Sequence, residues 1–308
     1  MTGGERRAPL APVAEAGMIS VVVCTRDRAA SLSRTLQSLG DMATPVSLEW
    51  ELLVVDNGSR DHTRDVVTGF ARVSPSRVRY LFEGRPGLSS ARNAGGRAAR
   101  GDVIAFTDDD CLVDRHWLAC IDGEFRADPS LAIVGGRVEL HDPRDQPVSV
   151  RAHRERVLVR SFRDIASLMI GCNMSCRKTV LAEMGYFDVR FGSGAPIPSA
   201  EDWDFLYKAY KAGAKIVFSP DVLLYHDHGR RSEAEVEPLN RAYIIGRWAF
   251  YCKHSASLDV ELAKSAAREL WWLVGSRQHR RRLIPVALGM TYWFRALVRT
   301  NAVRERAG

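Results

Sequence analysis

Three adjacent aspartates, Asp108, Asp109 and Asp110, are the residues whose types and spacing point most directly to chemistry. They follow the apolar segment Val103 to Phe106, which is typical of a buried strand. Because neighbouring carboxylates repel one another, a strand that ends on three of them favours a cationic ligand, such as a divalent metal that carries phosphates. Aspartates also cap helices and suit loops, so the motif alone does not decide between these interpretations.

Two further polar motifs contain groups that could take part in the same chemistry. The apolar run Val222 to Leu224 leads into Tyr225 to His228, whose two histidines could bind a metal or lie as surface imidazoles on a turn. The acidic cluster Glu201 to Asp204 opens a segment with an apolar helical face. Acids in the first turn of a helix stabilise its dipole, which is the structural interpretation of Glu201 and Asp204.

The elements that must position these motifs alternate between strand-like and helix-like segments from Met18 to about Leu140. Continuous apolar runs predict strands that are buried on both faces, and apolar residues at helical spacing follow the first two of them. This βαβ pattern predicts an α/β fold with a parallel sheet covered by helices. The predicted strands are Ile19 to Val23, Leu52 to Val55, Tyr80 to Phe82 and Val103 to Phe106.

Polar motifs follow three of these strands, at Cys24 to Arg26, Asp56 to Gly58 and Asp108 to Asp110. Ligands of such sheets bind at the carboxyl ends of the strands, so we expect the three motifs to share one edge. Asp56 ends its strand, where a carboxylate can accept hydrogen bonds from a base imide or a ribose hydroxyl. We favour that role over turn capping. The sequence contains no GxGxxG after the first strand and no P-loop motif, so neither a dinucleotide site nor a P-loop is indicated.

The composition is that of an ordinary globular enzyme. With 308 residues, the chain can bury a core in one large domain or in two smaller ones. The formal charge is +7, but zinc-ligand patterns, RNA-binding signatures and long basic runs are missing from the first two thirds, so we expect no nucleic acid partner. Six cysteines without CxxC spacing predict free thiols in a reducing cytoplasm. Residues 1–17 lack the apolar core of a secretory signal, and we expect a flexible leader there.

The C-terminal part of the chain predicts helices at Arg241 to Lys253, Val260 to Val274 and Leu283 to Val298. None of them has the roughly 18 uncharged apolar residues of a membrane-spanning helix. Tryptophans and basic residues intermingle there, which suits an anionic membrane surface. A helical appendage packed on the core or on a second subunit is the alternative. The residues concerned are Trp248, Trp271, Trp272, Trp293, Arg277, Arg280, Arg281, Arg282 and Arg295.

Five motifs in a fixed order give most of the sequence, roughly Met18 to Gly229, a resemblance to a known family. They are VVVCTRDRAASLSRTLQSL, ELLVVDNGSRDHT, GLSSARNAGGRAARGDVIAFTDDD, IGCNMSCRKTVLAEMGYFD and AEDWDF. This succession resembles the family 2 glycosyltransferases with a GT-A fold. The resemblance implies a Rossmann-like, mostly parallel sheet with helices on both faces. It also implies an inverting transferase that uses a nucleotide-diphosphate sugar and a divalent cation, Mn²⁺ or Mg²⁺.

The extent of the resemblance, with the patterns on either side of it, divides the chain into three parts. After the leader at residues 1–17, residues 18–235 would form the GT-A domain that binds the nucleotide sugar and the acceptor. Residues 236–308 would form a helical extension that faces a membrane or a partner.

The resemblance further implies which residues bind the nucleotide. Thr25 and Asp56 match positions that hold the base, and we expect Arg26, at the same strand end, to contact the donor as well. Arg92 and Asn93 match a loop that closes on the nucleotide.

A metal site is implied at the acidic triad. Asp108 matches the first acid of the DxD motif, which contacts the ribose, and Asp110 matches the last acid, which binds the metal. The middle residue here is also an aspartate, so either Asp109 or Asp110 could be the direct ligand of a metal that bridges the diphosphate. In GT-A enzymes a histidine after the last strand often completes the metal shell, which implies His226, with His228 as the alternative.

For Asp202 the resemblance implies the role of general base. An acceptor hydroxyl must lose its proton as it attacks the anomeric carbon, and a carboxylate within hydrogen-bond reach can take that proton. We expect Glu201 and Trp203 to contact the acceptor, and the Gly- and Pro-rich stretch Phe191 to Ser199 to form a mobile acceptor loop.

Two other functions fit parts of the sequence. A sugar-nucleotide pyrophosphorylase would need a Gly-rich, basic phosphate loop after the first strand, and Thr25 to Arg28 is not one. A non-catalytic nucleotide-sugar-binding protein would not need the intact acid pairs. For the transferase we expect a nucleotide sugar as donor and a saccharide, a lipid-linked compound or a natural product as acceptor. The expected location is the cytoplasm, with peripheral contact at the inner face of the membrane or a second subunit as candidate roles of the extension.

Overall fold

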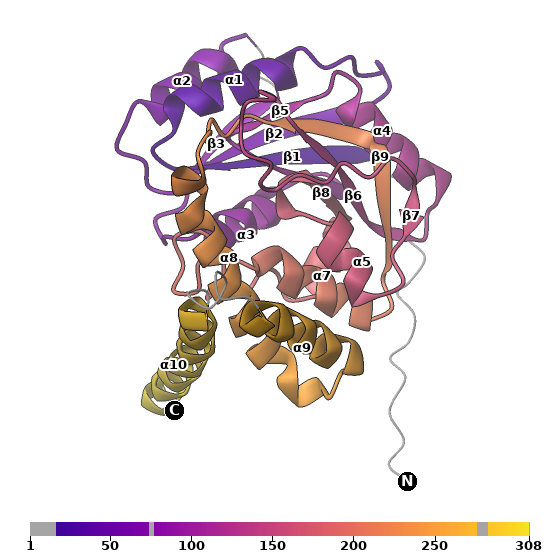
Figure 1. The fold of residues 1–308 in the computed structure, drawn as a ribbon. Helices are drawn as coiled ribbons and strands as arrows, with labels where there is room; N and C mark the ends of the chain where they lie inside the picture. The colour runs from indigo at the N-terminus through magenta and orange to yellow at the C-terminus, as the bar shows by residue number, and fades with distance from the viewer. Residues whose placement is uncertain (1–16, 74–76, 276–282, 308) are drawn as a thin grey trace.

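The computed structural model describes residues 17–73, 77–275 and 283–307, so nearly all of the expected leader lies outside the described residues. The predicted apolar runs form strands of a nine-stranded sheet in the order β3-β2-β1-β4-β8-β6-β9-β5, with β7 paired to β9 (Figure 1). Four strands at one side of the sheet run parallel, as predicted: β3 (Val78–Phe82), β2 (Glu49–Asp56), β1 (Met18–Thr25) and β4 (Val103–Asp108).

The other side of the sheet is mixed. Strand β8 (Met174–Arg177) runs antiparallel to both of its neighbours, β4 and β6 (Leu131–Leu140). Strand β9 (Lys215–His226) is parallel to β6 and antiparallel to the short strands β5 (Cys111–Val113) and β7 (Val157–Leu158).

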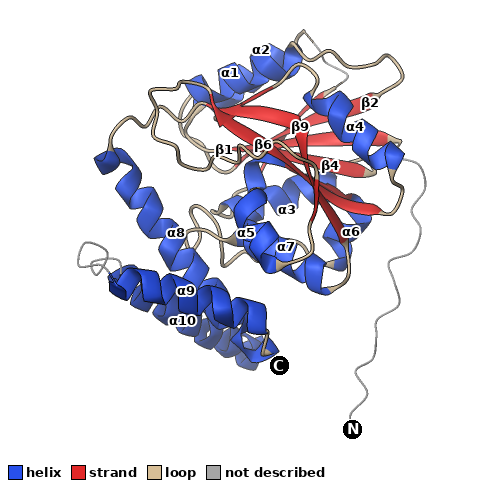
Figure 2. Ribbon diagram, turned by 45° about the vertical axis from the view of Figure 1, so that its right-hand side comes forward, coloured by secondary structure: helices blue, strands red, loops and turns tan. Residues whose placement is uncertain are grey.

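Helices cover both faces of the sheet, as expected for strands that are apolar throughout (Figure 2). In β1, Val21 and Val23 belong to the hydrophobic cluster under one set of helices, and Val22 and Cys24 belong to the cluster on the opposite face. The first set is α1 (Ala29–Gly40), α2 (Thr63–Ala71) and α4 (Trp117–Ala127). The second is α3 (Leu88–Ala98), α5 (Phe162–Leu168), α6 (Lys178–Glu183) and α7 (Glu201–Lys211).

Three helices follow the last strand: α8 (Glu233–His254), α9 (Val260–Gly275) and α10 (Leu283–Ala307). A capping box of Ser232 and Glu235 starts α8 at Glu233, three residues before the predicted start of the extension at residue 236. Trp248 of α8 and Trp293 of α10 are buried in the same cluster as α7, so these helices pack on the core. The described part of the chain contains no helix with both the length and the apolar character to cross a membrane.

The remaining aromatic and basic residues of the extension have different surroundings. Trp271 is 80% exposed and Trp272 is 48% exposed, and Arg295 is also exposed. The predicted basic cluster, Arg277, Arg280, Arg281 and Arg282, lies outside the described residues.

Strand pairing brings distant motifs together at one edge of the sheet. Cys24, next to Thr25, lies opposite Asp108, so the ends of β1 and β4 are adjacent. Cys111, which follows the acidic triad, lies opposite His226 at the end of β9. Thr25 lies opposite Asp56 at the end of β2. The predicted convergence of the three polar motifs at the carboxyl ends of β1, β2 and β4 is therefore confirmed, and β9 adds His226 to this edge.

Candidate functional site

A cavity of about 690 Å³ lies at this edge, lined by the ends of β1 and β4, the start of α7 and one side of α8. Most of the predicted site residues line it, whereas Asp56, Asn93 and His228 do not. Those that line it are Thr25, Arg26, Arg92, Asp108, Asp109, Asp110, Glu201, Asp202, Trp203 and His226.

Two of the three aspartates are held by residues at the end of β1. The Thr25 hydroxyl donates a 2.7 Å hydrogen bond to Oδ2 of Asp109. Arg28 lies 2.8 Å from Asp110 and 3.3 Å from Asp109, measured between guanidinium nitrogen and carboxylate oxygen. Burial, with the negative charge of Asp110, raises the pKa of Asp109 to about 7 despite Arg28. Arg28 was not among the predicted site residues, although its spacing from Thr25 would place it at the same strand end.

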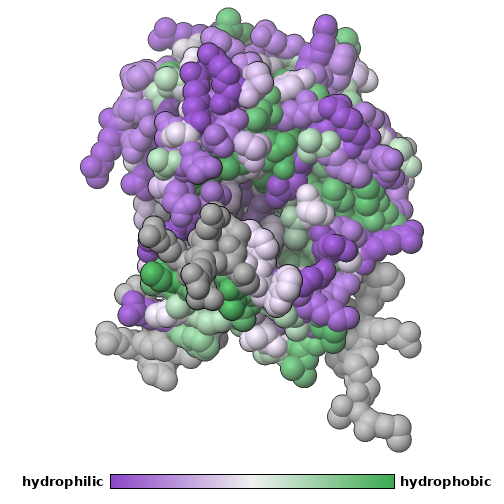
Figure 3. Space-filling model, viewed as in Figure 1, coloured by the Kyte–Doolittle hydropathy of each residue, from purple (hydrophilic) through white to green (hydrophobic). Residues whose placement is uncertain are grey.

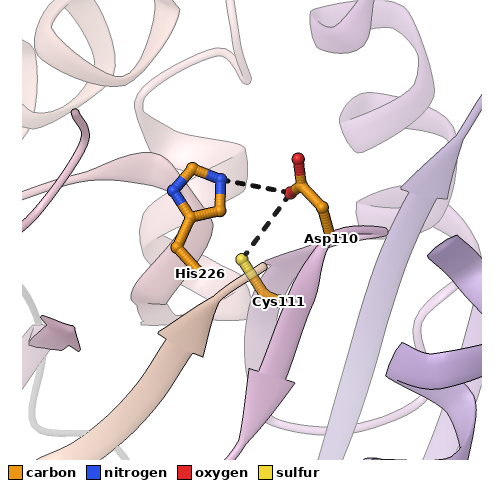
Figure 4. Close-up of side chains that lie close together, drawn as sticks. All are labelled: Asp110, Cys111 and His226. Atoms are coloured by element: carbon orange, nitrogen blue, oxygen red, sulfur yellow. Dashed lines mark hydrogen bonds and ion pairs between the residues drawn. The ribbon is translucent and has the colours of Figure 1, made fainter. Parts of the chain in front are cut away.

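Asp110 also contacts the histidine at the end of β9 (Figure 4). Nε2 of His226 lies 3.3 Å from Oδ1 of Asp110. Burial lowers the pKa of His226, but the hydrogen bond and charge of Asp110 outweigh it and raise that pKa to about 9. Burial likewise opposes ionisation of Asp110, yet His226 and Arg28 hold the pKa of its carboxyl below the usual range.

The donor set suits a divalent cation. Ligand atoms of Asp110, Cys111 and His226 lie within 4.8 Å of one another, and Nδ1 of His226 is buried with no hydrogen-bond partner among the described residues. A carboxylate and an imidazole leave positions for phosphate oxygens, which is how Mn²⁺ and Mg²⁺ are often held beside phosphates. A hydrogen bond with Cys172, together with burial, raises the pKa of Cys111, which favours its protonated thiol, a poor ligand.

The alternative histidine, His228, has other polar partners, although its ring centroid lies 4.9 Å from that of His226. Nε2 of His228 lies 3.1 Å from the carbonyl of Gln146, and its Nδ1 lies 3.7 Å from Asp145. Of the predicted candidates, Asp110 and His226 are the two whose ligand atoms lie close together.

Arg92 connects the triad with the second acidic cluster. Its guanidinium lies 3.0 Å from Asp108 and 2.9 Å from Glu201, and its side chain is only 2% exposed. The prediction of a loop at Arg92 and Asn93 is wrong, because both lie in helix α3. Asn93 bonds the backbone of Phe187 through both its amide nitrogen and its oxygen, which is a structural role.

Close packing explains the two adjacent glycines in this helix. A Cβ on Gly95 would lie 2.5 Å from Val22, and one on Gly96 would lie 2.5 Å from Leu181. Gly95 therefore lets α3 approach the sheet closely, and Gly96 lets it approach α6, without ending the helix.

Asp202 projects into the cavity from the first turn of α7. Its Oδ2 accepts a 2.9 Å hydrogen bond from the amide of Gly171, and its Oδ1 accepts one of 2.8 Å from the amide of Trp203. Burial and the charge of Asp202 raise the pKa of Glu201 to about 7, although Arg92 opposes this shift. Trp203 packs edge-to-face on Phe162, so much of its ring serves the core.

Asp204 is not a solvent-exposed acid at the start of a helix. It is fully buried and lies 2.7 Å from Lys253 and 2.8 Å from His254 of α8, and 3.6 Å from Lys208. Its carboxylate therefore joins α7 to α8 rather than merely facing the helix dipole.

Asp56 ends β2 as predicted, but its carboxylate is bonded to its neighbours. It accepts hydrogen bonds of 2.7 Å from the amide of Ser59 and of 2.7 Å from the hydroxyl of Tyr80. Asn57 lines the cavity instead, and its amide group bonds the backbone of Glu83, Arg85 and Gly87.

Comparison with known proteins identifies the family. The model of glycosyl transferase family 2 matches residues 20–185, more than half of the chain. This chain belongs to glycosyl transferase family 2. Among its relatives, glycosyltransferase AglE of Haloferax volcanii is 26% identical over 83% of this chain and 80% of AglE. Validoxylamine A glucosyltransferase of Streptomyces hygroscopicus subsp. jinggangensis is 34% identical, but the match covers only 42% of this chain and 30% of that enzyme.

Solved structures show the same fold. Staphylococcus aureus TarS 1-349, in complex with UDP-GlcNAc, has a TM-score of 0.58 and 20% identity, over 75% of this glycosyltransferase and 66% of that chain. The mannosyltransferase PcManGT of Pyrobaculum calidifontis, in complex with GDP-Man and Mn²⁺, has a TM-score of 0.52 and 19% identity, over 93% and 87% of the chains. The expected fold class and the enzyme class, a glycosyltransferase, are confirmed.

Sequence reasoning missed the contribution of α8 to the cavity of this glycosyltransferase. Asn240, Tyr243 and Arg247 of α8 line it, and the hydroxyl of Tyr243 lies 2.6 Å from that of Ser149. Burial raises the pKa of Tyr243 to about 12, and the negative charge of Asp202 adds to this shift. The first helix of the predicted extension thus forms part of the site. The sequence could not show this, because it depends on how α8 packs on α7.

Proposed function

We propose that this glycosyltransferase moves a sugar from a nucleotide-diphosphate sugar to an acceptor hydroxyl, with inversion at the anomeric carbon. One observation carries the proposal: a single cavity contains both the acidic triad and Asp202, and Arg92 is ion-paired with both clusters. A donor held at the triad would therefore present its sugar near a carboxylate that can accept a proton. The UDP-GlcNAc and GDP-Man complexes of the two fold relatives support this class of donor.

Residues at the triad would hold the diphosphate end of the donor. Asp110 and His226 supply the oxygen and nitrogen ligands for a divalent cation, and Thr25 and Arg28 fix the orientation of Asp109 beside them. When bound, Mn²⁺ or Mg²⁺ would neutralise charge on the leaving diphosphate. The Mn²⁺ complex of PcManGT supports the choice of metal.

Asp202 would act as the general base. The amide of Gly171 holds one of its oxygens, and the carboxylate keeps further lone pairs for an acceptor hydroxyl. Proton removal by a positioned carboxylate typically contributes 10²- to 10⁴-fold, on the order of 3 to 5 kcal/mol. A single displacement needs no covalent intermediate on the enzyme, which is consistent with an inverting reaction.

The extension would bring the enzyme to an anionic membrane surface from the cytoplasmic side. Lys264, Arg268, Trp271 and Val274 are exposed at helical spacing along one stripe of α9. Figure 3 shows hydrophobic residues among polar ones at the lower end of the molecule, where α9 and α10 lie in Figure 1. Basic and aromatic side chains on one stripe match an anionic headgroup layer, so a lipid-linked acceptor is a substrate class to test beside soluble saccharides.

The experiment is a panel of nucleotide sugars, each tested for thermal stabilisation of the enzyme with Mn²⁺ and with chelator. The donor that stabilises the enzyme is then incubated with an acceptor panel, and the anomeric configuration of the product is read by NMR. We expect metal-dependent stabilisation by a sugar nucleotide and an inverted product. A product that retains the donor configuration would contradict the mechanism, and formation of a sugar nucleotide from a sugar phosphate and a nucleoside triphosphate would favour the pyrophosphorylase.

A further inference from the structure

The arginines that line the cavity differ in how their charges are compensated. Arg28 pairs with Asp109 and Asp110, and Arg92 pairs with Asp108 and Glu201. Arg247 lies 2.7 Å from Glu269 of α9, and Arg26 lies 3.8 Å from Asp27. Carboxylates of the protein therefore compensate the charges of these four guanidinium groups.

Two other arginines of the cavity, Arg151 and Arg230, form no ion pair with any described residue. Arg151 donates instead to backbone carbonyls, from Nη1 to Val150 at 2.8 Å and from Nε to Met169 at 3.3 Å. A guanidinium has five N–H donors, so several donors of Arg151 remain for a ligand. By contrast Arg231, next to Arg230, pairs with Asp142.

These two arginines belong to segments that are joined to each other and to the base. The amide of Gln146 donates a 2.8 Å hydrogen bond to the carbonyl of Arg230, which ties the segment leading to Arg151 to the loop after β9. The carbonyl of Met169 accepts from Arg151, and two residues later the amide of Gly171 holds Asp202. The uncompensated positive charge of Arg151 therefore lies beside the segment that positions the general base.

We propose that the acceptor of this enzyme carries a phosphate or diphosphate group, and that Arg151 and Arg230 bind it on the Asp202 side of the cavity. This inference rests on the proposed function, because it assumes that Asp202 marks the acceptor side. Guanidinium groups bind phosphate oxygens in a bidentate manner, and two of them from separate segments match a doubly charged phosphate better than a singly charged carboxylate. The group could belong to a soluble sugar phosphate or to a lipid-linked saccharide.

A binding experiment tests the inference without requiring transfer. A sugar 1-phosphate is titrated calorimetrically into the enzyme in the presence of chelator, which removes any metal-dependent binding at the acidic triad. We expect binding to the wild type and a loss of about 10- to 100-fold in Arg151→Gln, because charge-assisted hydrogen bonds are lost. Arg151→Lys should recover part of the affinity. Arg154→Gln, at an exposed arginine that pairs with Glu139 and does not line the cavity, is the control and should bind as the wild type does. Equal binding by wild type and Arg151→Gln, or an equal loss in Arg154→Gln, overturns the inference.

A kinetic experiment then distinguishes the acceptor from the donor and identifies the source of the phosphate. With the donor found in the nucleotide-sugar panel, the acceptors compared are a free sugar, its 1-phosphate, its uronic acid and a polyprenyl diphosphate sugar in detergent. Arg151→Gln and Arg230→Gln should raise KM only for phosphate-bearing acceptors and leave the donor KM unchanged. A rise in the donor KM would contradict the inference, because the arginines would then bind the donor diphosphate. Equal use of the free sugar and its phosphate would also contradict it.

The preferred phosphate-bearing acceptor, the soluble sugar phosphate or the polyprenyl compound, shows which kind of molecule carries the phosphate that the enzyme recognises. Absence of transfer to every acceptor would count against the proposed function, while the calorimetric result would still decide the role of Arg151.

Discussion

Each aspartate of the triad has a different set of partners. Asp108 is held by Arg92, Asp109 by Thr25 and Arg28, and Asp110 by Arg28 and His226. The sequence predicted three carboxylates at a strand end but could not distinguish them. Their partners come from α3, from the end of β1 and from β9, and only the folded sheet brings these together.

His226 and His228 provide a matched pair for testing the metal site, since His226 ends β9 and His228 lies two residues later, but only His226 contacts Asp110. His226→Ala should weaken metal-dependent donor binding by roughly 10-fold or more, because a lost ligand reduces charge stabilisation at the diphosphate. His228→Ala should leave the metal concentration for half-maximal donor binding unchanged. The measurement is donor affinity against Mn²⁺ concentration, and the reverse order of effects would assign the site to His228.

Glu201 predicts a specific pH dependence of stability. Its pKa is raised from 4.5 to about 7 in the folded protein, so the folded state binds this proton more tightly than the unfolded chain does. Stability contributed by the protonated group is therefore lost as pH rises from about 4.5 to about 7. The difference in unfolding free energy between wild type and Glu201→Gln should change across this window. Asp109, whose pKa is also raised to about 7, titrates in both proteins, so its contribution cancels in this difference. Parallel stability curves would show that Glu201 does not titrate there.

Among the elements, α3 and α7 show best what a sequence pattern leaves open. The family resemblance implied a loop around Arg92, whereas the structure has a helix there. Gly95 lets this helix approach the sheet, and Gly96 lets it approach α6. The acidic residues at the start of α7 predicted the first turn of a helix, and the structure confirms that helix. The sequence did not predict that Asp204 is buried against cationic side chains of α8. Local spacing predicts helices well; it does not reveal which distant helix supplies a counter-charge.

Removing the buried charge that joins α7 to α8 should destabilise the fold. Asp204→Asn leaves Lys253 and His254 without their carboxylate, and breaking a buried ion pair from one side costs on the order of 3 to 5 kcal/mol. Asp128→Asn, which breaks a pair with the exposed Lys215, is the control and should cost about 1 kcal/mol or less. Chemical denaturation measures both costs. Equal costs for the two variants would refute the role of Asp204.

The contribution of Asp204 to stability should also depend on pH. Because the pKa of Asp204 is lowered in the folded protein, its contribution to the unfolding free energy is present above its unfolded pKa and is lost as pH falls below that value.

At the scale of the whole molecule, the predicted extension has two different parts. Its first helix completes the cavity through Tyr243 and Asn240, whereas α9 carries a basic and aromatic stripe on the surface. The sequence alone could not distinguish the cavity-lining residues of α8 from the surface residues of α9, because the distinction depends on how α8 packs on α7.

The stripe on α9 leads to a test of membrane contact. The full chain should sediment with anionic vesicles at low salt and should be released at high salt, since the attraction is electrostatic and screened. Arg268→Gln and Trp271→Ala should each weaken the binding severalfold, and Arg156→Gln, at an exposed arginine paired with Glu124 of α4, should not. Equal sedimentation with neutral and anionic vesicles would rule out this contact.

The measurement that tests the account most directly separates binding from transfer at Asp202. Asp202→Asn keeps the shape of the side chain and an oxygen for the amide of Gly171, but it removes the proton acceptor. Donor affinity, measured by calorimetry with Mn²⁺, should stay within about twofold of the wild type, while kcat for transfer to the acceptor should fall by roughly 10² to 10⁴ across neutral pH. Transfer by Asp202→Asn at the wild-type rate, with donor binding intact, would contradict the central claim and make Glu201 the next candidate for the base.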